Sequence, residues 1–246
     1  MTGLALPTRR DEAFRYADFD ALARVWPVVG ESIVVPAGAS EARTLVMDAA
    51  GEAPVARHIE ILVEPGGRFD CHALNAGAGY GRLELDVTLL EGAAFHLGAA
   101  QLGAGEQTLE IVTDVRHAAP NAVSRQVIRS VLGGHATGSY LGKVGVARGA
   151  DGTDAEQSVR AMLLDRTATA NARPELEIFA DDVKCAHGCA VGELDPTALF
   201  YLASRGLPPA EAKRLMLQAF IAAAFVGARD EAELTAAALR RLEAML

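Results

Sequence analysis

The stretch IEILVEPGGRF, residues 59–69, joins an alternating apolar run to a glycine turn, and LELDVTLLEGAAF, residues 83–95, repeats its plan. Apolar and polar residues that alternate are typical of a half-buried β-strand. With a third run, the centres fall at Ile61, Leu85 and Ile111, about 25 residues apart. This spacing predicts stacked coils of a β-solenoid, although three imperfect repeats leave an ordinary β-sandwich open.

The composition narrows the class of protein. Half of the 246 residues are hydrophobic but only 5% are aromatic, so the core must be built mainly from aliphatic side chains. The net charge of −9 disfavours a nucleic-acid partner, because affinity for a phosphate backbone comes from Lys and Arg. We therefore expect a protein that does not bind nucleic acid.

Neither a leader nor a membrane span is indicated. The first residues lack the apolar stretch of a secretory signal, and the richest apolar window, residues 215–228, falls short of the roughly 18 residues that span a bilayer. An odd number of cysteines fits a reducing compartment. We expect a cytoplasmic protein, without membrane contact, in which Cys71, Cys185 and Cys189 are thiols.

The chain divides into three predicted parts. Residues 1–28 resemble a short helical arm, residues 29–193 carry the strand pattern, and residues 194–246 form a helical subdomain. Residues 77–81 (GAGYG) and 138–144 (GSYLGKV) fail the spacing of phosphate-binding loops, so we interpret both as turns and expect no bound nucleotide.

Helix ends in the predicted subdomain are marked by capping residues. Asp195 followed by Pro196 predicts a helix start, and Gly206 its end. A second helix is expected over residues 209–226, with apolar residues around most of its surface, which predicts two packing partners. Asp230 and Glu233 resemble a capping box that opens a third helix, to about residue 245, and Asp11 is a candidate cap in the arm.

Four residues of the strand region invite a metal interpretation. They are His58, Cys71, His72 and His96. Imidazole and thiolate suit Zn²⁺ or Fe²⁺, and three such ligands with an open position would make a catalytic centre. Their spacing is loose, however, so histidines with ordinary structural roles are the favoured interpretation and a metal-dependent β-fold enzyme the alternative.

The densest cluster of chemical groups is ADDVKCAHGCAVGELDP, residues 180–196. In an extended strand Cys185, His187 and Cys189 share one face, although Gly188 favours a bend. Three such ligands hold a thiophilic metal only with a fourth from elsewhere, and the alternative is that both cysteines pack as small apolar residues. The adjacent Asp181 and Asp182 would point opposite ways and cannot act as a paired acid and base.

Residues 173–225, which contain this cluster, resemble the C-terminal signature of the SufB/SufD family of iron–sulfur cluster assembly scaffolds. Residues 117–144 and 154–178 are similar to the family core, and residues 6–19 (LPTRRDEAFRYADF) resemble its SufD members rather than its SufB members. Ala186 and Cys189 stand where the family usually has serine and alanine.

The resemblance implies a right-handed parallel β-helix flanked by helical regions. It implies a noncatalytic scaffold that pairs with SufB and docks the SufC ATPase through its C-terminal helices. It also implies that His187 contributes to a transient iron–sulfur cluster at the interface, opposite a cysteine of SufB. Roles for Cys185 and Cys189, and self-pairing into a homodimer, stay open.

Overall fold

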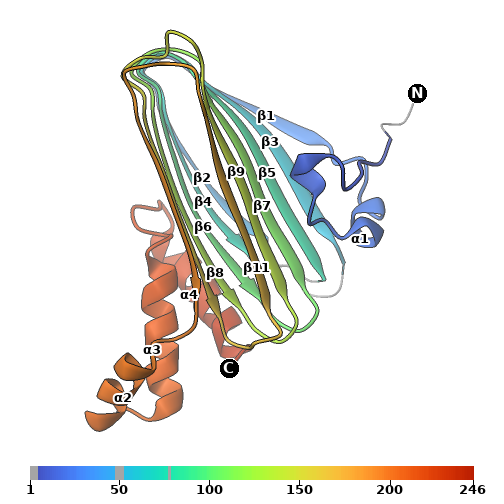
Figure 1. The fold of residues 1–246 in the computed structure, drawn as a ribbon, viewed down its shortest axis with the longest axis vertical. Helices are drawn as coiled ribbons and strands as arrows, with labels where there is room; N and C mark the ends of the chain where they lie inside the picture. Colours follow the sequence, from blue (N-terminus) through green and yellow to red (C-terminus); the bar gives the residue numbers. More distant parts are fainter. Residues whose placement is uncertain (1–4, 48–52, 77–78) are drawn as a thin grey trace.

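The chain folds into a β-solenoid in the computed structural model, which describes residues 5–47, 53–76 and 79–246 (Figure 1). The strands in these ranges are β1 (Gly30–Val35), β2 (Ser40–Met47), β3 (Val55–Val63), β4 (Arg68–Asn75), β5 (Tyr80–Leu89), β6 (Ala94–Gly103), β7 (Thr108–His117), β8 (Val123–Leu132), β9 (Thr137–Val146), β10 (Asp154–Leu163), β11 (Thr169–Ile178) and β12 (Lys184–Gly192). The predicted solenoid is thus confirmed.

Successive strands alternate between two parallel sheets. One sheet, here the odd-strand sheet, has the order β1-β3-β5-β7-β9-β11, and the even-strand sheet has the order β12-β10-β8-β6-β4-β2. Each coil therefore adds one strand to each sheet, as Figure 1 shows. The three runs that predicted the repeat are β3, β5 and β7, which are neighbours in the odd-strand sheet.

The register differs from the predicted spacing by two residues per coil. Ile61 pairs with Val87 rather than with Leu85, and Leu85 pairs with Thr113 rather than with Ile111. Side chains on a strand alternate between faces with a period of two, so an offset of two leaves the apolar residues on the same face. The apolar pattern alone could not detect this difference.

The repeated turn between the sheets has a clear physical basis. Phe69 and Phe95, which end the two similar phrases, are register partners, and their rings stack with centroids 6.4 Å apart. In each coil the turn also holds a left-handed residue whose N–H donates to a carbonyl in the turn of the next coil. These residues are Gly38, Gly66, Gly92, Asn121 and Gly152. Glycine occupies four of these five positions because it adopts positive φ without steric cost.

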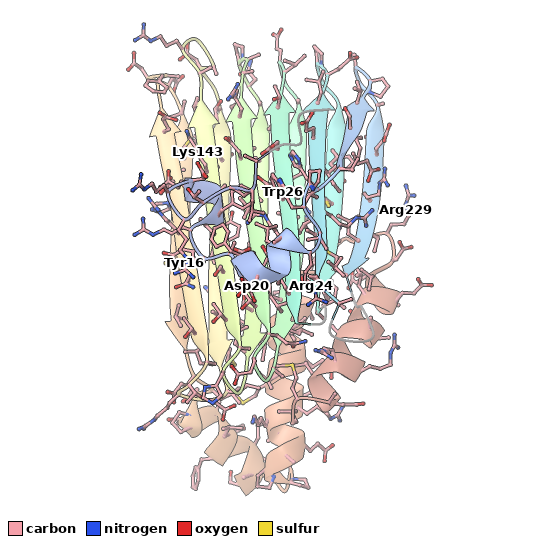
Figure 2. The ribbon with its side chains drawn as sticks, turned by 90° about the vertical axis from the view of Figure 1, so that its right-hand side faces the viewer. Tyr16, Asp20, Arg24, Trp26, Lys143 and Arg229 are labelled. Atoms are coloured by element: carbon pink, nitrogen blue, oxygen red, sulfur yellow. The ribbon has the colours of Figure 1, made fainter. Side chains whose placement is uncertain are left out.

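The N-terminal arm lies across the outer face of the odd-strand sheet (Figure 2). It contains a 3₁₀ turn (Glu12–Phe14) and the helix α1 (Phe19–Ala23). Leu22 of the arm packs on Tyr80 of β5. Arg82 of β5 donates to the carbonyl of Ala13 and lies 4.0 Å from the centre of the Phe14 ring. The arm is thus anchored to the solenoid by apolar, hydrogen-bond and cation–π contacts.

Three helices follow the last strand: α2 (Pro196–Ser204), α3 (Pro209–Ala222) and α4 (Glu231–Glu243). Side chains from α3, the turn that follows it and α4 cover part of the outer face of the even-strand sheet (Figure 1), where Leu217, Phe225 and Leu234 pack against Leu74 and neighbouring strand residues. Leu215 of α3 lies outside this contact and is 44% exposed. None of the helices in the described ranges has the length and apolar character to cross a bilayer.

Helix ends were predicted with mixed success. Asp195 accepts a hydrogen bond from the N–H of Thr197, and Gly206 adopts a φ of 91°, so both predictions for α2 are confirmed. Asp11 and Asp230 make no side-chain cap, and the predicted capping box is wrong. Glu231 instead accepts from the N–H of Gly227.

The second predicted helix is too long, because α3 ends at Ala222. The N–H groups of Ala224 and Phe225 bond to carbonyls three residues earlier, which tightens the chain out of the α-helix before Gly227. Alanine and aromatic residues here carry no stop signal of their own.

The glycine stretches interpreted as turns lie largely in strands. Residues 138–144 are inside β9, and residues 80–81 open β5, whereas residues 77–78 lie outside the described residues. Gly142 is required by packing rather than by a turn, since a Cβ there would lie 2.0 Å from the Tyr140 hydroxyl. The interpretation of residues 138–144 as a turn is therefore wrong.

Candidate functional site

The cluster in residues 180–196 lies at the end of the solenoid. Strand β12 is the edge strand of the even-strand sheet and pairs only with β10 among the described strands. Cys185, His187 and Cys189 are partners of Ala155, Gln157 and Val159, all of which are buried inside the solenoid. The three residues thus share the face that turns toward the interior, and β12 continues through Gly188 without the expected bend.

Exposure within this set differs because no described coil stacks on β12. His187 and Cys189 are exposed, whereas Cys185 is half-buried and packs against the core. Burial raises the pKa of the Cys185 thiol, partly offset by a hydrogen bond with the backbone of Ala155. In the free chain Cys185 is therefore a weaker thiolate donor than its place in the motif implies.

The three side chains form an open row of donors. Among the described residues, three donor atoms of His, Cys, Asp or Glu come within 4.8 Å of one another only at His58, Glu84 and Asp86. Residues two apart on a strand are separated by roughly 6.6 Å, which explains why β12 alone does not close a ligand set. Ligands to an ion at β12 would have to come in part from outside this strand.

The row is bordered by apolar groups of the last coil. Leu176 and Ala172 of β11 are only partly buried although they pack on the core, because β11 is also an edge strand. Ile178, Phe179 and Val191 are exposed large apolar residues around the same end of the solenoid. We call β11, β12 and the Phe179–Val183 connection the open end of the solenoid.

Beneath His187 lies a polar network that sequence reasoning missed. The Gln157 side chain donates to the Tyr140 hydroxyl at 3.0 Å and to the Gly142 carbonyl at 3.1 Å, and its Oε1 has no partner. Tyr140 in turn donates to Gln126, which accepts from Thr113. The signal was present in the sequence as polar residues at inward strand positions, but their strands had first to be assigned to coils.

The four residues of the alternative metal site do not converge. Cys71 is in the interior, where burial raises the pKa of its thiol to about 12. His72 and His96 lie with their ring centres 5.1 Å apart, and His72 is buried; burial lowers the pKa of both. His58 is on the odd-strand sheet. The alternative interpretation is therefore not supported, because His58 lies on a different sheet from the other three residues and Cys71 faces the interior.

The adjacent acids also fall outside a catalytic arrangement. Asp181 and Asp182 lie in the bend between β11 and β12 and are exposed. The carbonyl of Asp182 accepts a hydrogen bond from the N–H of Gly152, so this residue continues the turn stacking of the solenoid.

Comparison with known proteins agrees with this fold. Residues 29–220 match the family described as "SUF system FeS cluster assembly, SufBD core domain". The chain is 37% identical over 135 residues to "Protein ABCI7, chloroplastic" of Arabidopsis thaliana, covering 54% of this chain and 27% of that protein. It is 36% identical over 108 residues to "Iron-sulfur cluster assembly protein SufD" of Escherichia coli, covering 44% of this chain and 26% of that protein.

The SufD protein of Bacillus subtilis is also 36% identical, over 121 residues, which cover 49% of this chain and 28% of that protein. The chain thus aligns with about a quarter of the length of these relatives. The family match spans the whole strand region, α2 and most of α3. This chain belongs to the SufBD family of the SUF iron–sulfur cluster assembly system.

Proposed function

We propose that the chain is a noncatalytic scaffold subunit that pairs with SufB through the open end of the solenoid and contributes His187 to cluster formation. The observation that supports this most strongly is the place of His187, which is exposed on the edge strand β12, beyond which no described strand continues the solenoid. Unpaired strand edges are ready surfaces for another chain. The apolar groups Ile178, Phe179 and Val191 around it favour a protein partner.

The chemistry of the row fits a shared site. Imidazole is a borderline ligand and thiolate a soft one, and both bind iron in clusters. With His187 on this chain and a thiolate on SufB, the ligand set is complete only when the two chains meet. The cluster is then cargo, held while the interface is closed and released when it opens. Cys185 and Cys189 are the further candidates to contact iron or sulfur.

We also propose that the helices of residues 194–246 form a subdomain that docks SufC, apart from the 29–193 solenoid and the 1–28 arm. On α2, Phe200 and Tyr201 are 75% and 57% exposed, and no residue of this helix is buried. Leu215 of α3 and Val226 beyond its end add to the exposed apolar surface. SufC would bind the ATP that drives opening of the interface with SufB, and the complex would act in the cytoplasm.

The test is coexpression with SufB and SufC, followed by copurification and cluster reconstitution. We expect all three chains to copurify and His187→Ala to assemble markedly less cluster while still binding both partners. His135→Ala is the matched control, since His135 is exposed in the turn before β9, far along the chain from β12.

The outcomes separate the parts of the proposal. If the chain binds neither SufB nor SufC, the scaffold role is contradicted. Normal assembly by His187→Ala contradicts only the ligand role. Sedimentation of the isolated chain tests whether it forms a homodimer. A homodimer that dissociates when SufB is added would mean that self-association and SufB binding use the same open end.

A further inference from the structure

A second group of donors lies far from β12, on the outer face of the odd-strand sheet. His58 of β3 is the register partner of Glu84 on β5, and Asp86 is two residues further along β5 on the same face. The donor atoms of these three residues lie within 4.8 Å of one another. The sheet register therefore gathers one imidazole and two carboxylates on a rigid surface.

The cations near the group are shared among several carboxylates. Arg82 contacts Glu84 at 3.0 Å and the buried Glu110 at 3.2 Å, so one guanidinium serves two carboxylates. Asp114 follows Asp86 in the register, and its partner Lys143 forms its ion pair with Glu177. Among the described residues Asp86 forms its ion pair with His58 rather than with Lys or Arg, so a divalent cation would offset its charge.

His58 and Asp86 already lie side by side. His58 Nε2 and Asp86 Oδ2 are 2.8 Å apart, and both side chains are partly buried on neighbouring strands of one sheet. A cation at this position would therefore meet two donor atoms that the fold already holds close together.

The group also opens to a cavity. His58 and Glu84 line a space of about 370 Å³ whose other wall is the arm, through Phe14, Trp26 and Pro27. Figure 2 shows Trp26 of the arm over the sheet. Such a cavity leaves room for water or an exchangeable ligand beside the donors.

We propose that His58, Glu84 and Asp86 bind a divalent first-row transition-metal cation, with water from the cavity in the open position. His58 would bind as a neutral imidazole through Nε2, with its ring proton on Nδ1, and Asp86 as a carboxylate. Their hydrogen bond would then be replaced by bonds to the cation, and the two atoms would separate to the spacing of about 3.3 Å found between ligands of a tetrahedral ion. Glu84 keeps its contact with Arg82, because a carboxylate has two oxygens and about four acceptor positions.

The donor set defines the class of ion. Without a thiolate it does not favour soft ions such as Cu(I), and the imidazole favours Zn²⁺, Fe²⁺ or Co²⁺ over Mg²⁺ and Ca²⁺. This proposal does not rest on the role of His187, because the two groups lie on different sheets and share no residue.

The experiment is calorimetric titration of the tag-free full chain with Zn²⁺, in a background where Cys185, His187 and Cys189 are replaced by Ala. We expect one site, and at least a tenfold loss of affinity in His58→Ala and in Asp86→Asn. His135→Ala should bind Zn²⁺ like the background, and circular dichroism should show that all variants are folded. The near-ultraviolet and visible absorption spectrum of bound Co²⁺ should lack thiolate charge-transfer bands, because the donors are nitrogen and oxygen.

Three results would overturn the site. These are no Zn²⁺ binding, binding that survives both substitutions, and a thiolate signature in the Co²⁺ spectrum, which would point to Cys71. The titration uses the isolated chain without SufB or SufC. A failure to bind Zn²⁺ therefore leaves the proposed scaffold role untouched, and a failure to copurify with SufB and SufC leaves the proposed metal site untouched.

Discussion

His187 and Gln157 are register partners on β12 and β10, one exposed at the open end and the other only 1% exposed beneath it. The coil that carries the candidate cluster residue thus stacks on a buried amide rather than on an apolar side chain. Gln157 is held by Tyr140 and Gly142 of the odd-strand sheet, so it links the two sheets just below the open end.

Replacing Gln157 by Leu should destabilise the chain by about 1–2 kcal/mol. The change removes two hydrogen bonds donated by the amide, and the loss is partly offset because the unpaired Oε1 also disappears. Urea unfolding measures the difference. Glu156→Gln, an exposed change on the same strand, is the control and should leave stability almost unchanged, because its ion pair with Arg125 at 3.8 Å lies at the surface. A Gln157→Leu chain as stable as the parent would show that the amide link does not contribute.

The three thiols should react at different rates with iodoacetamide. We expect Cys189 to react first because it is exposed, Cys185 more slowly because burial raises its pKa, and Cys71 hardly at all because its pKa is about 12 and it is buried. Mass spectrometry of the peptides measures each rate. In guanidinium all three should react alike, and rapid labelling of Cys71 in the native chain would contradict the described packing.

Gly98→Ala should loosen the C-terminal helices from the even-strand sheet. A Cβ at Gly98 would lie 2.0 Å from the backbone oxygen of Ala224 and 2.8 Å from the His72 ring, and backbone cannot move aside as a side chain can. We expect a loss of about 1–3 kcal/mol and faster amide exchange in α3 and α4. Gly145→Ala is the matched control, because a Cβ there meets nothing within 4 Å.

Stability should fall with acid in part through His117. Its ring is buried and contacts Ser124 Oγ at 2.9 Å, and burial lowers its pKa to about 4. The unfolded chain binds a proton near pH 6.5, above the folded pKa, so this contribution is complete above that pH and is lost as the pH falls toward 4.

His117→Gln removes that titration, so the difference in unfolding free energy between the two proteins should shrink by a few kcal/mol from pH 7 to pH 4. Urea unfolding across this range measures it. His72 and His96 contribute with the same sign in both proteins and cancel in the comparison. A difference independent of pH would mean that His117 is not buried in its neutral form.

Much of the fold was predictable because the alternation of Ile61, Leu85 and Ile111 reports directly which faces are buried. The register between strands was not predictable, because a shift of two residues leaves the same side chains on each face. Only the turns and the Phe69–Phe95 stack select one register. The caps show the same limit. Asp195 has its acceptor role within its own helix, whereas the chain around Asp230 is set by packing against the sheet.

The sequence by itself determined the solenoid class, the face shared by Cys185, His187 and Cys189, and the start of α2, because these depend on local periodicity and short-range capping. Only the tertiary structure decided which residues meet across coils. It separated His58 from Cys71, His72 and His96, and brought it to Glu84 and Asp86. The physical reason is that contacts between parallel strands join residues one coil apart, and the coil length follows from turn packing that no single stretch of sequence contains.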